Sequence, residues 1–105
     1  MARTWIDLCA SDDVPARGGR FVEAASRRLA VFRLATGDFR VLDDVCPHAG
    51  GSLSAGYVAD DCVICPWHGW PFDVHSGRCP DNSEVGVTTY PSRVVAGRVE
   101  CRLDG

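Results

Sequence analysis

The sequence contains no lysine, one methionine and only three histidines among its 105 residues. All 11 basic residues are therefore arginines, and against 14 acidic residues they leave a net charge of −3. An acidic chain without a basic stripe is a poor ligand for nucleic acid, so we expect no nucleic-acid partner. Nothing in the sequence explains the absence of lysine.

Long hydrophobic runs are also missing. No apolar stretch approaches the roughly 18 residues that cross a bilayer, and residues 1–5 lack the apolar segment of a secretory signal. We therefore expect no membrane partner and a cytoplasmic location. The length suits one domain over residues 1–105, with one modest core.

Helix signals are scarce, whereas strand signals run along the whole chain and predict an all-β fold. In the last predicted strand, Val99, Cys101 and Leu103 alternate with charged residues and are expected to face the core. The predicted strands are residues 5–9, 20–24, 28–34, 39–43, 57–58, 62–64, 71–74, 87–95 and 98–103.

The middle of the chain, residues 45–80, is rich in Gly, Pro and Asp and offers few apolar side chains. We predict a metal-binding insert over residues 45–80, flanked by a β base formed from residues 1–44 and 81–105. Because so little apolar surface is available, we expect the insert to need its metal to hold its shape.

Six cysteines are present, and in a short secreted chain an even count indicates a disulfide framework. The sequence shows no secretory context, so a metal site is the better interpretation. Two cysteines are each followed closely by a histidine, as Cys46 with His48 and Cys65 with His68. The six cysteines are residues 9, 46, 62, 65, 79 and 101.

Two thiolates and two imidazoles on two short loops suit two kinds of centre. One is a [2Fe–2S] cluster in which two histidines replace two cysteines on one iron. The other is a tetrahedral structural zinc site. Nearby Gly50, Gly51 and Gly69 allow tight loops around a cofactor, while Pro47 and Pro66 stiffen them.

The residues around these cysteine–histidine pairs distinguish the [2Fe–2S] cluster from the zinc site. Residues 46–53 read Cys-Pro-His-Ala-Gly-Gly-Ser-Leu, and residues 65–73 read Cys-Pro-Trp-His-Gly-Trp-Pro-Phe-Asp. This combination resembles the Rieske iron–sulfur family, in detail over residues 39–80. It is most similar to the small members, the Rieske-type ferredoxins and the small subunit of assimilatory NAD(P)H nitrite reductase.

The resemblance implies a Rieske domain with a small antiparallel β-sandwich or barrel base and an inserted cluster-binding subdomain. It implies one [2Fe–2S] cluster, with Cys46 and Cys65 on one iron. His48 and His68 would bind the other iron near the surface.

The resemblance further implies a ferredoxin-like carrier of single electrons, with no catalysis by this chain alone. The expected partners are a flavin reductase and either an oxygenase or the large subunit of a nitrite reductase. The alternatives are a nitrite reductase small subunit, and a structural zinc or redox-sensing module. A complete oxygenase is excluded, because its mononuclear iron needs two histidines and only His75 remains.

High-potential Rieske proteins carry an extra cysteine in each ligand loop, and this chain has Gly51 and Trp67 at those positions. They also carry a Ser and a Tyr that bond to sulfur, where this chain has Trp70 and Phe72. Without these groups the reduced cluster is less stabilised, which predicts a potential of roughly −150 mV.

The remaining candidates have simpler interpretations. Cys62 and Cys65 form a Cys-x-x-Cys pair, but a thioredoxin-like site needs a βαβ context that is absent. We expect Cys9, Cys62 and Cys101 to be buried, and Cys79 and the loop residue His75 to be exposed. Both tryptophans that flank His68 are expected to pack around the cluster, the alternative being one exposed partner anchor.

Overall fold

The computed structural model describes residues 4–46, 51–67 and 69–103, and within them it contains no α-helix. Twelve strands and two short 3₁₀ turns form the domain, so the prediction of an all-β fold is confirmed. In chain order the elements are β1 (Ile6–Ala10), η1 (Ser11–Asp13), β2 (Gly19–Ala24), β3 (Arg27–Arg33), β4 (Phe39–Asp43), η2 (Leu53–Ala55), β5 (Tyr57–Ala59), β6 (Cys62–Ile64), β7 (Pro71–Asp73), β8 (Arg78–Cys79), β9 (Asn82–Gly86), β10 (Thr89–Tyr90), β11 (Ser92–Val95) and β12 (Arg98–Cys101).

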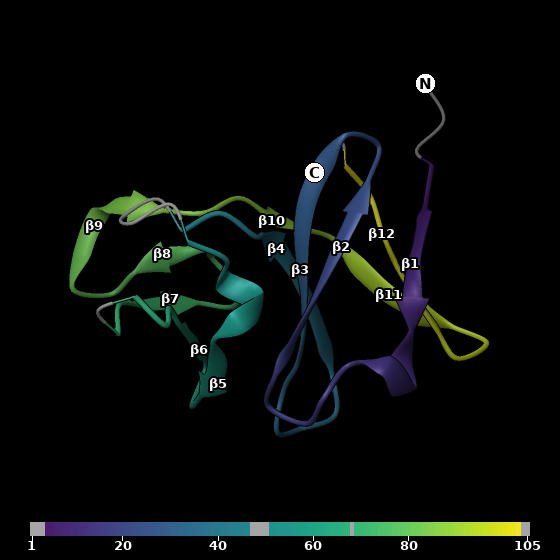
Figure 1. Ribbon diagram of the computed structural model, residues 1–105, viewed down its shortest axis with the longest axis horizontal. Coiled ribbons are helices and arrows are strands. Elements are labelled where there is room, and N and C mark those ends of the chain that lie inside the picture. Colours follow the sequence, from purple (N-terminus) through teal and green to yellow (C-terminus); the bar gives the residue numbers. More distant parts are fainter. Residues whose placement is uncertain (1–3, 47–50, 68, 104–105) are drawn as a thin grey trace.

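The strands form three antiparallel sheets and one hairpin. The central sheet has the order β10-β4-β3-β2, a second has β1-β12-β11, and a third has β5-β6-β7, while β8 pairs with β9. Figure 1 shows the central sheet in the middle of the molecule, with β5 to β9 on one side and β1, β11 and β12 on the other.

Strand β3 is buried on both faces because it lies between two apolar cores. Leu29 and Val31 pack into the core shared with β12, whereas Ala30 and Phe32 pack into the core shared with the insert. Successive side chains of a strand point to opposite faces, so one strand can serve both cores. All four side chains are fully buried.

The insert has its own apolar packing, so the expectation that it buries little apolar surface is wrong. Leu53, Val63 and Phe72 are completely buried there, and they share a core with Cys46 and Cys65. These side chains come from the η2 turn and two short strands. The overall composition of residues 45–80 does not reveal that these few apolar side chains are buried together.

The predicted strand over residues 87–95 is two strands that belong to different sheets. Tyr90 in β10 pairs with Val41 of β4, whereas Ser92 in β11 pairs with Cys101 of β12. Pro91 lies between them, and because proline has no N–H to donate, it suits the point where the chain leaves one ladder. The β8–β9 hairpin was not predicted at all.

The alternation predicted for the last strand is confirmed at its centre. Val99 and Cys101 are fully buried, while Leu103 lies beyond the end of β12 and packs against the same core from a half-buried position.

We expect Gly77→Ala to destabilise the domain more than Gly37→Ala. Both glycines have positive φ, +78° and +93°, which costs an L-residue about 1 kcal/mol. A Cβ at Gly77 would also overlap the carbonyl oxygen of Val87, whereas a Cβ at Gly37 meets no atom within 4 Å. The expected losses, measured by urea unfolding, are about 3 and about 1 kcal/mol. Equal losses would mean that the turn yields freely at Gly77.

Candidate metal centre

Two of the four predicted ligands, Cys46 and Cys65, lie together in the interior of the insert. Cys46 follows β4 and Cys65 follows β6, and neither has any exposed surface. The Cys46 thiol lies close enough to the Cys65 thiol to raise its pKa. The structure therefore brings together two cysteines that are separated by 18 intervening residues in the sequence.

Each cysteine begins a loop that is closed by a backbone hydrogen bond. The backbone N–H of Cys46 donates to the carbonyl of Gly51 at 2.8 Å, and that of Cys65 donates to the carbonyl of Trp70 at 2.8 Å. Within the second loop, Gly69 donates to the carbonyl of Cys65 at 3.1 Å and has a φ of +69°. In both loops, therefore, the backbone N–H of the cysteine closes the loop by a hydrogen bond to a later carbonyl.

The electrostatics of the pair disfavour two bare thiolates. Burial first, and the neighbouring Cys46 thiol second, raise the pKa of the Cys65 thiol to about 11. A hydrogen bond from the backbone of Trp67 acts in the opposite direction. Only thiolates bind metal strongly, so a positively charged centre must compensate for their burial. The donor set and the enclosed setting fit a thiolate-bound iron centre.

His48 and His68 lie outside the described residues, together with residues 47, 49 and 50. Among the residues that the structure does describe, no three metal-binding side chains come together. The assignment of the two histidines as ligands therefore stays a prediction.

Asp44 anchors the first loop, and the sequence analysis missed it. Its side chain is fully buried, and Oδ1 accepts a hydrogen bond from the N–H of Ser54 at 2.8 Å. Its backbone carbonyl accepts from Leu53 at 2.6 Å, and its N–H donates to Arg28 at 2.9 Å. Asp44 thereby ties the strand before Cys46 to the turn after the loop. The only sequence signal is an acidic residue two positions before the cysteine.

The loop that follows Cys46 and the loop that follows Cys65 contact each other where Gly51 meets Trp67. A Cβ at Gly51 would overlap the indole ring, so the ring lies directly on the glycine. The remainder of Trp67 faces solvent, with 55% of the residue exposed. The expectation that both tryptophans pack inward is thus wrong for Trp67, whereas Trp70 does pack against the buried core.

Comparison with known proteins decides the family. A model of the Rieske [2Fe-2S] domain matches residues 4–91. The chain belongs to the Rieske family. A Rieske domain holds one [2Fe–2S] cluster, and it is an electron-transfer module.

Among sequence relatives, the ferredoxin subunit of anthranilate 1,2-dioxygenase from Burkholderia cepacia is 39% identical over 82 residues. That match covers 76% of this chain and 74% of the relative. Cholesterol 7-desaturase from Hemicentrotus pulcherrimus is 36% identical over 78 residues, covering 73% of this chain but only 17% of the relative. The Rieske chain therefore spans about a sixth of that larger protein.

Solved structures include two Rieske proteins of nearly the same size as this chain. One is assigned as the small subunit of an NADH-dependent nitrite reductase from Mycobacterium tuberculosis, with a TM-score of 0.88 and 29% identity. It covers 97% of this chain and 96% of its own. The other is a chain from the complex of reduced oxygenase and oxidised ferredoxin in carbazole 1,9a-dioxygenase, with a TM-score of 0.81, 29% identity and coverage of 96% and 94%.

The burial of the other cysteines of this Rieske domain differs in part from the prediction. Cys9 and Cys101 are buried as expected, and burial raises the pKa of Cys101 to about 11. Cys79 was expected to be exposed and is buried, because β8 packs into the insert core. Cys62 was expected to be buried and is half-buried, since it begins β6 beside an exposed turn.

Among the remaining candidates, Phe72 is completely buried in β7. His75 is exposed, as predicted, and its Nδ1 accepts a 3.4 Å hydrogen bond from Nε of Arg40. No helix in the described part of the chain is long and apolar enough to cross a membrane.

We expect Asp44→Ala to loosen the first loop and to speed loss of the cluster. The substitution leaves the half-buried N–H of Ser54 without its protein acceptor, which costs about 1 kcal/mol. Asp44→Asn keeps an acceptor oxygen and serves as the matched control. Urea unfolding and the rate of bleaching of the cluster absorbance measure the two effects. Equal behaviour of the two variants would show that the hydrogen bond is unimportant.

We expect Gly51→Ala to reduce cluster retention and Trp67→Ala to restore it in the double variant. The new methyl group overlaps the indole, so removal of the indole should relieve the clash. Iron content per chain after gel filtration gives the readout for both single variants and the double variant. A double variant no better than Gly51→Ala alone would rule out this contact as the cause.

Proposed function

We propose that the chain is a ferredoxin-like carrier of single electrons. Its cluster would be held by Cys46 and Cys65 on one iron and by His48 and His68 on the other. The observation that carries this proposal is the pairing of the two buried cysteines on loops closed by matching hydrogen bonds. The bound cluster supplies reversible one-electron chemistry.

The protein would hold and shield this cluster rather than transform a substrate. Buried Leu53 and Phe72 keep water from the cysteine side, and Asp44 fixes the loop that carries Cys46. The histidine side would be the point where electrons enter and leave, as in the family that the chain belongs to. We therefore propose no catalysis by this chain alone.

The partners of the chain would be redox proteins. A flavin reductase would donate electrons, and an oxygenase would accept them. Support comes from the ferredoxin subunit of anthranilate 1,2-dioxygenase, of which this chain covers 74%. The exposed indole of Trp67, next to the cluster loops, is a suitable contact for such a partner.

A second candidate is the small subunit of an NAD(P)H nitrite reductase. It is favoured by the structural match at TM-score 0.88, which covers nearly the whole of both chains. The sirohaem and flavin of such an enzyme would lie on its large subunit. Neighbouring genes separate the two candidates, since one predicts a large sirohaem reductase and the other an oxygenase with a flavin reductase.

We propose a low reduction potential, roughly −150 mV. Gly51 lies against an indole ring and cannot form a disulfide, and Phe72 offers no hydroxyl to cluster sulfur. Each missing stabilisation of the reduced cluster lowers the potential. Such a potential suits electrons that arrive from NAD(P)H through a flavin.

The proposed organisation is one domain, with base residues 1–44 and 81–105 and a cluster-binding insert over residues 45–80, acting in the cytoplasm. The β8–β9 hairpin spans the boundary between residues 80 and 81. The packing of β3 against both cores supports a single folding unit.

Low-temperature EPR of the reduced protein, with iron and acid-labile sulfide counted, tests this function. We expect a Rieske signal, two irons and two sulfides per chain, and a midpoint below zero. Cys46→Ser should abolish the cluster, whereas Cys62→Ser, at a half-buried cysteine apart from the pair, should retain it. Colourless anaerobic protein that contains zinc and no labile sulfide would disprove the proposal. A midpoint above zero would disprove only the low potential.

A further inference from the structure

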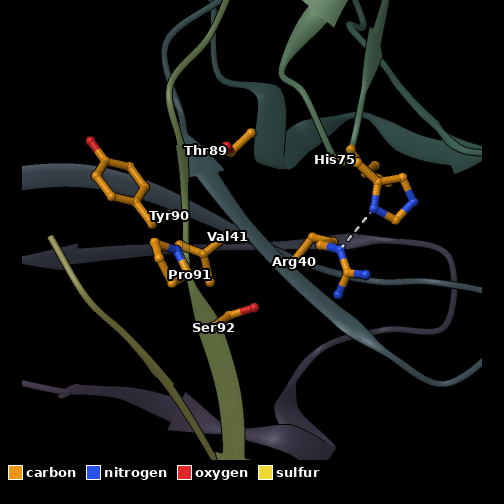
Figure 2. A pocket seen from close by; sticks show the side chains of 8 residues that line it. Arg40, Val41, His75, Thr89, Tyr90, Pro91 and Ser92 are labelled. Atoms are coloured by element: carbon orange, nitrogen blue, oxygen red, sulfur yellow. Dashed lines mark hydrogen bonds between the residues drawn. The ribbon is translucent and has the colours of Figure 1, made fainter. Parts of the chain in front are cut away.

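A second candidate site lies where the insert meets the central sheet, away from the cysteine pair. A cavity of about 400 Å³ opens between β4, the turn after β7, and the β10–β11 segment. Figure 2 shows Arg40 and His75 facing one another on one side of this cavity, with Thr89, Tyr90, Pro91 and Ser92 along the other.

The polar groups of the cavity wall include two that can carry positive charge. Nε of Arg40 donates to Nδ1 of His75 at 3.4 Å, which is long for a hydrogen bond of this type, so the contact is weak. Nη1 of Arg40 donates to the carbonyl of Phe39 at 2.8 Å, and Nη2 makes no such bond within the described structure. The guanidinium therefore retains donors for a ligand.

No carboxylate is found among the described residues that line this cavity. The nearest acidic groups on the surrounding elements already accept hydrogen bonds. Asp73 accepts the backbone N–H groups of His75 and Ser76, at 2.8 and 3.0 Å. Asp43 accepts from the hydroxyl of Tyr90 at 2.6 Å.

On the far side of Arg40, in the adjoining cavity, Asp38 bonds to the hydroxyl of Thr36 and Glu100 pairs with Arg93. Arg40 thus brings its charge to a cavity whose described lining holds no carboxylate, and the carboxylate of Asp73 lies beside the backbone of His75.

We propose that this cavity binds a small oxyanion between Arg40 and His75. The guanidinium offers planar donors suited to two oxygens, and the imidazole, whose Nδ1 accepts from Arg40, offers the N–H of its other nitrogen. The hydroxyls of Thr89 and Ser92 lie on the opposite wall. The buried residues Val41 and Val74 also line the cavity.

The position of the site gives the anion a structural effect. Arg40 belongs to the central sheet and His75 to the insert, so one ligand would join the two parts through charge-assisted hydrogen bonds. A ligand that binds only the folded state stabilises it in proportion to the logarithm of its concentration. The thermal midpoint should therefore rise with oxyanion concentration, independently of the oxidation state of the cluster.

Amide NMR of the intact holoprotein tests the site. Sulfate is titrated at constant ionic strength, with chloride as the balancing ion. We expect saturable shifts at His75, Thr89 and Ser92.

Arg40→Gln should weaken sulfate binding at least about tenfold. His75→Gln, at an exposed side chain that does not threaten the fold, should also weaken sulfate binding, but by less than Arg40→Gln does. The matched control is Arg28→Gln, which removes an equal charge from an exposed strand position and should leave binding unchanged. Acetate, titrated in the same way, tells a carboxylate site from one that requires a tetrahedral anion.

Shifts that grow linearly with sulfate would overturn the proposal. So would equal weakening by Arg40→Gln and Arg28→Gln, or sulfate binding that His75→Gln leaves unchanged. Because none of these readouts involves electron transfer, the result is independent of the proposed function.

Discussion

The burial of β3 on both faces is the constraint on which the rest of the structure depends. Leu29 and Val31 complete one core, and Ala30 and Phe32 complete the other. A shift of one residue in the register of β3 would exchange these two sets, so both cores fix the same register. The insert is thereby built on the central sheet rather than attached to it by a linker.

This packing places the cysteine pair, Cys46 and Cys65, in the interior. Cys46 lies just beyond β4, the neighbour of β3, and Cys65 follows β6 in the insert. Because the same core includes Phe32 and Phe72, the two sulfurs meet in an apolar environment. Burial that raises the pKa of Cys65 also limits access of water, so the site favours a bound positive centre over free thiolates.

The loops show how a Rieske domain can be stabilised without a disulfide between them. In this chain the contact is the indole of Trp67 on Gly51, and Trp67 remains largely exposed to solvent. An exposed aromatic ring beside a redox centre offers contact area to a partner at low cost in side-chain entropy. The same residue thus links the packing of the two loops with the surface that a partner would meet.

The sequence by itself determined the all-β class, the family and the identity of the candidate ligands. Strand periodicity and the spacing of Cys46, His48, Cys65 and His68 are local features, and local features can be read along one chain. Only the tertiary structure decided which side chains are shared or buried. The side chain of Asp44 accepts a hydrogen bond from a backbone N–H ten residues away. The chain passes from one sheet to another at Pro91. Cys79 is buried by its packing in the core of the insert. These outcomes depend on contacts between segments that are distant in sequence, so no pattern within a single segment encodes them.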